Sequence, residues 1–118
     1  MGGRLGRKFH PLYMNSTNLV KPVLRDAFDD SFINSGTYKM TLTDEDNSNV
    51  SGAVDISLEA VGSDGVWKGF IPHSITLTEN DIYILTLTFT GTDGHVLKDV
   101  RWYKACKYPK NEYDINLQ

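Results

Sequence analysis

Apolar and polar residues alternate over short segments between residues 36 and 108, and glycine-containing turns separate these segments. Tyr38, Met40 and Leu42 alternate with lysine and threonine, which is the period of a strand with one buried and one solvated face. The same period returns in residues 54–60, 66–71 and 82–90. Because no long segment has the helical period, the pattern restricts the chain to an all-β domain.

Turn signals and a proline set the number and order of the predicted strands. Residues 62–65 (Gly-Ser-Asp-Gly) and 91–94 (Gly-Thr-Asp-Gly) favour tight hairpin turns, because Asp and Gly tolerate positive φ angles. A first strand over residues 19–24 is expected at a sheet edge, since Pro22 cannot donate a ladder hydrogen bond. We therefore predict an immunoglobulin-like antiparallel β-sandwich of about six or seven strands, with an extended N-terminal arm and a C-terminal tail.

Two segments of the predicted sandwich require special geometry. Residues 73–81 are polar apart from Ile75 and Leu77, so we expect them to cross between the sheets with one or both of these side chains as plugs. The last strand, 95–108, changes the parity of its apolar residues along its length. This change predicts a bulge of one extra residue near residues 98–99.

The strand pattern divides the 118 residues into one domain and two appendages. Residues 19–108 are the predicted sandwich, residues 1–18 an N-terminal docking arm and residues 109–118 a C-terminal tail that pairs as a strand with a neighbour. The arm mixes basic and apolar residues without a period, so it is either a disordered leader or an anchor that orders on a partner. The residues expected to bind partners are Arg4, Arg7, Lys8, Phe9, Leu12 and Tyr13 in the arm and Tyr113, Ile115 and Leu117 in the tail.

The charge distribution excludes some partners and favours others. The net charge is -3, which gives no global field for nucleic acid or an anionic membrane, although residues 98–108 interleave basic and aromatic side chains. The first ten residues carry three basic side chains and no acidic one, whereas residues 26–64 carry nine acidic side chains and Lys39. A basic arm on an acidic body favours docking onto another copy or another acidic surface.

Cysteine usage and hydropathy indicate where the chain folds. The single cysteine, Cys106, excludes an internal disulfide, which favours a reducing compartment. No apolar run is long enough to span a membrane, and no signal-peptide core follows the basic residues at the start. We therefore expect folding in a cytoplasm, without a membrane partner.

The ionisable residues indicate neither metal binding nor catalysis. Residues 44–49 (Asp-Glu-Asp-Asn-Ser-Asn) offer oxygen ligands for calcium, but they lack the glycine and the distal glutamate of an EF-hand loop. We expect a solvated loop there, and its affinity for a cation stays open. The histidines lack zinc-site spacing, and a cysteine in a strand is more often a small core residue than a nucleophile. We therefore predict no enzyme activity and no cofactor.

Five segments carry a resemblance to a known group of proteins: residues 37–44 (TYKMTLTD), 50–53 (VSGA), 63–72 (SDGVWKGFIP), 81–83 (DIY) and 101–105 (RWYKA). They resemble small immunoglobulin-like proteins of tailed bacteriophages, in which a Gly-aromatic-x-Gly-x-Ile-Pro segment precedes a tyrosine-bearing strand and a closing strand. The resemblance covers residues 36–108 and transfers no functional site. It implies that Trp67, Ile71, Pro72, Tyr83 and Trp102 are framework residues. The loop at residues 44–49 is longer and more acidic than the short turn of that group.

The resemblance implies a virion structural protein at the head-to-tail neck, on the capsid or on the tail. Our leading hypothesis is therefore a non-enzymatic module that self-associates or binds other virion proteins through its arm, its tail and exposed strand edges. The alternative is an immunoglobulin-like recognition domain for carbohydrate or a host cell surface, which uses the loops at one end. An exposed Trp67 or Tyr103 beside Asp64 or Asp93 would support it, and burial of these rings would count against it. A third hypothesis is a small hydrolase that uses Cys106 or His95.

Overall fold

All regular structure within the described part of the chain is β-strand. A computed structural model describes residues 9–107, and no helix within this range is long and apolar enough to cross a membrane. The strands are β1 (His10–Tyr13), β2 (Asn18–Val20), β3 (Thr37–Asp44), β4 (Ile56–Val61), β5 (Val66–Ile71), β6 (Ile82–Thr90) and β7 (Val96–Cys106). The predicted all-β class and the predicted hairpin turns are confirmed.

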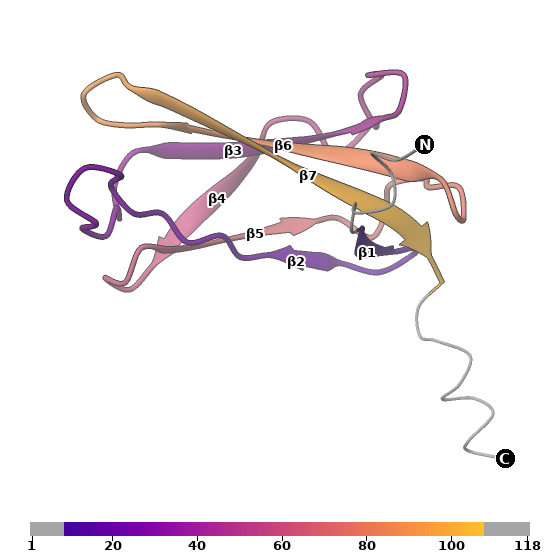
Figure 1. The fold of residues 1–118 in the computed structure, drawn as a ribbon. Coiled ribbons are helices and arrows are strands. Elements are labelled where there is room, and N and C mark those ends of the chain that lie inside the picture. Colours follow the sequence, from indigo (N-terminus) through magenta and orange to yellow (C-terminus); the bar gives the residue numbers. More distant parts are fainter. Residues whose placement is uncertain (1–8, 108–118) are drawn as a thin grey trace, which may run out of the picture.

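The strands form one sheet that folds over itself into a nearly closed sandwich. Its order is β1-β7-β6-β3-β4-β5-β2. Strands β3, β6 and β7 form one layer, β5 and β2 lie opposite, and β4 crosses between the layers (Figure 1). Every pairing is antiparallel except that of β1 with β7, which is parallel. The predicted edge position of the strand beside Pro22 is confirmed, because β2 ends the sheet.

Aromatic side chains from both layers meet in the core. Tyr38 of β3, Trp67 of β5 and Phe89 of β6 contact one another edge to face, with ring centroids 5.5 to 5.7 Å apart. This geometry is favourable beyond the area buried, since the positive edge of one ring faces the negative face of the next. Ile75 and Leu77 are buried beside this core, which confirms both as plugs of the crossing segment.

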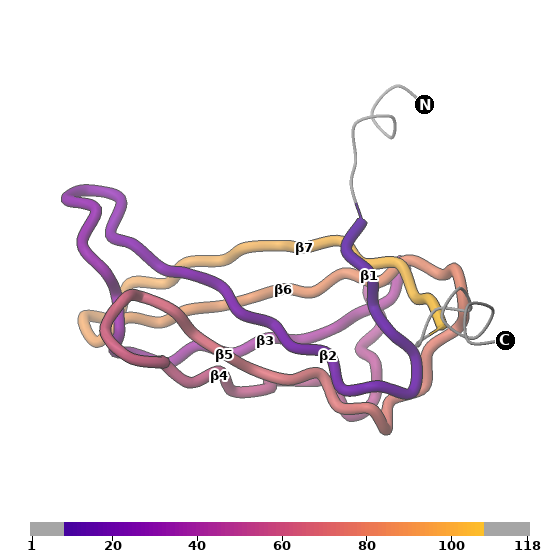
Figure 2. Tube along the Cα trace, turned by 90° about the horizontal axis from the view of Figure 1, so that it is seen from below, coloured from indigo at the N-terminus to yellow at the C-terminus, as the bar shows by residue number. Residues whose placement is uncertain are grey.

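The two edge strands of the sheet are consecutive in the sequence, and Asn18 joins them. Its Oδ1 accepts a hydrogen bond from the Tyr13 N–H at 2.9 Å. Its Nδ2 donates to the carbonyl oxygens of Tyr13 at 2.9 Å and Ser16 at 3.1 Å. The buried amide thus substitutes for a strand partner of Tyr13 and closes the sandwich where β1 meets β2 (Figure 2).

The structure differs from the predicted docking arm over residues 10–18. Leu12 is 0% exposed and lies in the core, and β1 pairs with Tyr103–Cys106 of β7 in the same molecule. Leu12 is therefore part of the sandwich and is not available to a partner. The sequence pattern missed β1 because only four residues form it and Pro11 interrupts any alternation.

The predicted bulge in the last strand is wrong. The register between β6 and β7 is continuous from Ile82 opposite Lys104 to Thr90 opposite Val96. The parity changes because the residues from Val96 to Val100 are all exposed, so neither face selects for apolar side chains there. Trp102 faces outward and is half-buried, so the expectation that it fills the core is also wrong.

The burial of Leu12 makes a stability measurement decisive for the role of β1. We expect Leu12→Ala to lower the free energy of unfolding by about 2 to 5 kcal/mol, since it leaves a cavity in the core. The matched control is Leu19→Ala on β2, where the side chain is 54% exposed and the expected loss is within about 0.5 kcal/mol. Equal losses in urea unfolding would contradict the placement of β1 in the sandwich.

Candidate functional site

The segment between β2 and β3 has little regular structure of its own and is held by the β4–β5 hairpin. The Leu24 N–H donates to the Gly65 carbonyl at 2.8 Å, and the Gly65 N–H donates to Asn34 Oδ1 at 2.7 Å. Gly65 has a positive φ of 74°, and a Cβ there would collide with the Leu24 carbonyl oxygen. The Trp67 Nε1–H also donates to the Ile33 carbonyl at 2.9 Å. The loop is thereby fixed to the core.

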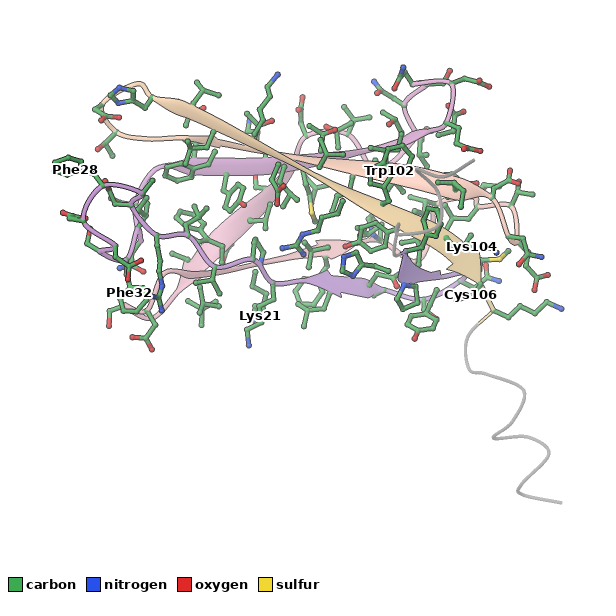
Figure 3. All side chains as sticks on the ribbon, in the orientation of Figure 1. Lys21, Phe28, Phe32, Trp102, Lys104 and Cys106 are labelled. Carbon is green, nitrogen blue, oxygen red and sulfur yellow. The ribbon has the colours of Figure 1, made fainter. Side chains whose placement is uncertain are left out.

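The tip of this loop projects Phe28 into solvent. Asp26 Oδ1 accepts the Phe28 N–H at 2.7 Å, which makes a tight turn. Asp29 Oδ1 accepts hydrogen bonds from the Ser31 hydroxyl at 2.7 Å and the Ser31 N–H at 3.0 Å, which hold the pKa of Asp29 below its ordinary value. The Phe28 side chain stands 97% exposed at the end of the molecule (Figure 3).

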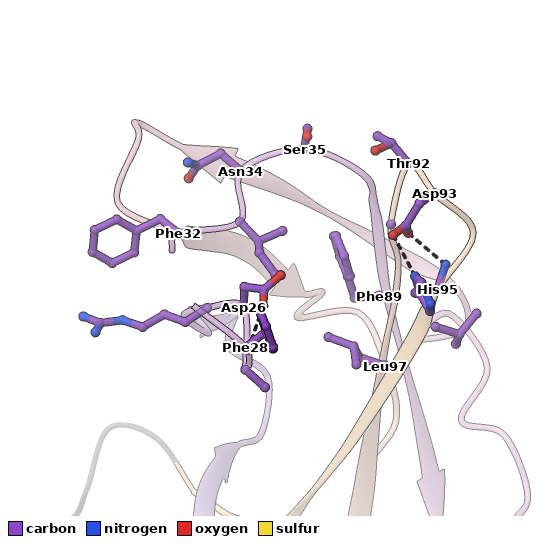
Figure 4. Close-up of a pocket in the computed structure, with 15 residues that line it drawn as sticks. Asp26, Phe28, Phe32, Asn34, Ser35, Phe89, Thr92, Asp93, His95 and Leu97 are labelled. Carbon is purple, nitrogen blue, oxygen red and sulfur yellow. Dashed lines mark hydrogen bonds and ion pairs between the residues drawn. The ribbon is translucent and has the colours of Figure 1, made fainter. Parts of the chain in front are cut away.

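A groove of about 560 Å³ separates this loop from the β6–β7 hairpin (Figure 4). Its lining is apolar in the middle, where Phe89 and Leu97 face the loop, and polar at the rim. Phe32, Val96 and Leu97 beside it are each about half exposed. We call the groove and these exposed side chains, together with Phe28, the apolar end of the sandwich. An aromatic group or an aliphatic side chain from another molecule fits this chemistry.

One ion pair organises the hairpin side of the apolar end. His95 Nδ1 lies 2.7 Å from Asp93 Oδ2, and the His95 N–H donates to Asp93 Oδ1 at 3.0 Å. The hydrogen bond to Asp93 and its negative charge raise the pKa of His95, while the backbone N–H and ring of His95 lower the pKa of Asp93. Both side chains are exposed, so the pair shapes the turn and contributes little to global stability.

An open strand edge continues from the apolar end along β7. Strand β6 pairs with β7 over Val96–Lys104, but β1 covers only Tyr103–Cys106. Within residues 9–107, no strand therefore lies beside Val96–Arg101 on the side away from β6. A second groove, of about 210 Å³, runs under this edge toward Pro22 and Leu24.

The predicted partner-binding residues have different positions. Phe9 is 37% exposed, Tyr13 is half-buried and Leu12 is buried. The other predicted residues, Arg4, Arg7, Lys8, Tyr113, Ile115 and Leu117, lie outside the described residues. Sequence reasoning missed Phe28, Phe32 and Leu97. The sequence indicated them in one way only: they are large apolar residues in stretches without the regular alternation of a half-buried strand or helix.

The structure does not assemble a metal or nucleophile site from the described residues. No group of three or more His, Cys, Asp or Glu side chains within residues 9–107 is placed to hold a metal ion. In the acidic loop, Asp44 Oδ1 instead accepts the N–H groups of Asp46 and Ser48, each at 2.9 Å. His95 immediately precedes β7 and Cys106 ends it, so at about 3.3 Å per residue the two are roughly 36 Å apart. His95 therefore cannot activate the Cys106 thiol.

Comparison with known proteins identifies the fold. No protein-family model and no curated protein matches the chain. Among solved structures, the crystal structure of CopC from Methylosinus trichosporium OB3b is similar, with a TM-score of 0.51 and 13% sequence identity. The match covers 86% of this chain and 87% of that chain. At this identity the likeness concerns the fold alone, and it confirms the predicted immunoglobulin-like sandwich.

The His95–Asp93 pair predicts a specific titration. NMR should give His95 an imidazole pKa above its ordinary value of 6.5, and Asp93→Asn should return it toward that value. Because the pKa is raised in the folded state, the pair stabilises the turn below the unfolded-state pKa. This contribution is lost as the pH rises through the folded-state pKa. Asp99→Asn on the same hairpin is the control, and an equal effect of both substitutions would exclude the pair as the cause.

Proposed function

We propose that the protein is a non-enzymatic structural component of a tailed-bacteriophage virion, in the neck, on the capsid or on the tail. It folds in the host cytoplasm and assembles with other virion proteins, including copies of itself. The immunoglobulin-like fold and the sequence resemblance over residues 36–108 support this proposal. The observation that carries it is the apolar end of the sandwich, where Phe28 is 97% exposed.

An exposed apolar end of this kind needs a partner. Burying a phenylalanine side chain contributes about 1.5 to 3 kcal/mol, and phenylalanine is enriched in the buried core of protein interfaces. Phe28 stands on a loop that main-chain hydrogen bonds fix to the core, so little conformational entropy is lost when it docks. Val96 and Leu97 extend the same surface onto β7. The apolar end is therefore suited to a permanent protein contact.

The burial of Trp67 and Tyr103 counts against the alternative function, a carbohydrate-recognition domain. Trp67 is 3% exposed and Tyr103 is 6% exposed, so neither ring offers a stacking surface to a sugar. The large exposed rings at the apolar end, Phe28 and Phe32, have no hydroxyl or ring nitrogen for hydrogen bonds. These observations favour a protein partner over a carbohydrate.

The proposal predicts a separation between folding and assembly. Phe28→Ser should leave the unfolding free energy within about 0.5 kcal/mol of wild type, because the side chain touches little of its own chain. The same substitution should reduce incorporation into purified virions at least about tenfold, measured by quantitative mass spectrometry after complementation. Phe70→Ser is the matched control, since Phe70 is 47% exposed on the outer face of β5.

Absence of the wild-type protein from purified virions would overturn the virion proposal. Equal incorporation of the Phe28→Ser and wild-type proteins would overturn the role of the apolar end.

A further inference from the structure

We infer that the open edge of β7, Val96–Arg101, binds the C-terminal tail (residues 109–118) of a second copy of this chain as an added antiparallel strand. This inference deepens the proposed function, because it names a partner and a contact for the self-assembly. It rests on the hydrogen-bonding direction of β7, the groove beside it, and the length, pattern and charge of the tail.

The backbone of β7 presents hydrogen-bonding groups to the open side. The Ala105 N–H and carbonyl bond to Asp81 and Asn80, toward β6, whereas the Cys106 carbonyl accepts the Met14 N–H beside β1. Since these directions alternate along a strand, the groups of Val96, Lys98 and Val100 point away from β6. The Val100 N–H confirms this direction, because it donates to Asp99 Oδ1 at 2.9 Å instead of to a neighbouring strand.

The side chains along this edge are suited to contact with another strand. Val96, Leu97 and Val100 are each about half exposed. Native proteins usually protect such an edge with a short strand, a proline or a covering segment, because an exposed apolar edge pairs with other chains. The groove of about 210 Å³ under the edge is lined by apolar side chains, with Lys98, Asp99 and Arg101 at its side. Alternate side chains of an added strand would enter this groove.

The sequence of the tail matches this edge in length and pattern. Tyr113, Ile115 and Leu117 alternate with polar residues, which is the period of a strand with one apolar face. Residues 113–118 are six in number, as are the residues of Val96–Arg101. When these two segments are paired antiparallel from end to end, Leu117 lies opposite Leu97. Pro109 stops the tail from simply continuing β7.

Charge distinguishes the tail from the N-terminal arm as the occupant. In this register Asp114 of the tail lies diagonally across from Lys98 on the same face of the sheet, so the two side chains are complementary in charge. An arm that continued β1 in register would instead place Lys8 opposite Arg101. It would also place Gly2, Gly3 and Gly6 along the strand, where glycine is unfavourable.

The position of β1 favours a tail from another copy over the tail of the same molecule. The tail follows Lys107, at the end of β7 where β1 occupies the edge. To reach Val96–Arg101 of its own molecule it would have to pass around β1. The tail of a second copy has no such obstacle. If each copy donates its tail to one neighbour and accepts the tail of another, a ring forms, and if two copies exchange tails, a two-fold dimer forms.

The direct test is disulfide trapping between two differently substituted copies of the full chain. Both carry Cys106→Ser; one adds Lys98→Cys at the edge, and the other adds Asn116→Cys, which the antiparallel register places opposite it. We expect a disulfide-linked pair at a yield at least about tenfold above the control in which Glu59→Cys, exposed on the outer face of β4, replaces Lys98→Cys. Equal yields would overturn the inference. So would a link that forms only within one molecule when a single chain carries both cysteines.

Self-association of the full chain provides the second test. Lys98→Pro removes an outward N–H from an edge strand, a position where proline is tolerated, whereas Lys98→Ala removes only the charge. The association constant measured by sedimentation should fall at least about tenfold for Lys98→Pro and less than about threefold for Lys98→Ala. Circular dichroism checks that both variants fold. Equal association of Lys98→Pro and wild type, or of wild type and a chain ending at Tyr108, would overturn the inference.

The experiments distinguish failure of the virion proposal from failure of the tail contact. If the protein is incorporated into virions and Phe28→Ser prevents this, but no disulfide forms between copies, the tail contact is wrong and the virion proposal stands. If the disulfide forms but virions lack the protein, the tail contact stands and the virion proposal is wrong.

Discussion

The bidentate contact between the Asn18 side chain and the backbone of Tyr13 determines the shape of the whole sandwich. The amide pairs with Tyr13 as a strand residue would, and so joins the two edge strands of a seven-strand sheet. Losing it would leave a Tyr13 N–H and carbonyl without partners at the join, which costs about 1 to 3 kcal/mol per buried group. The same contact turns the chain away from β7 after Tyr13, which lies opposite Cys106. Within residues 9–107, β1 covers Tyr103–Cys106 of β7, and no strand lies beside Val96–Arg101 on that side.

The open side of β7 and the apolar end both lie away from this closed part of the sheet. The aromatic contacts among Tyr38, Trp67 and Phe89 keep the layers together, and Trp67 also fixes the loop that carries Phe28. The core can therefore be stable while one end exposes large apolar side chains. A monomer gains nothing from Phe28 at 97% exposure, whereas an assembly gains a rigid aromatic anchor. The framework residues Trp67 and Phe89 thus support the loop and the groove of the apolar end.

Most of the fold was predictable from the sequence, and most of the candidate site was not. Strands 37–44, 66–71 and 82–90 were found because burial of one face imposes a strict alternation. Strand β1 was missed because its burial rests largely on Leu12, and because the pairing partner lies some ninety residues away. The bulge was predicted wrongly because alternation carries no information where both faces are exposed. Phe28 leaves no periodic signal, since its exposure depends on hydrogen bonds between distant segments.

Backbone hydrogen exchange at Val96 and Lys98 tests most directly whether the protein assembles through the open edge. Their outward N–H groups should exchange at least about tenfold more slowly in the associated protein than after dissociation by dilution, because an added strand protects them. The N–H groups of Leu97 and Asp99, which point toward β6, should be protected in both states. Equal exchange of the Val96 and Lys98 amides in the two states would contradict assembly through this edge.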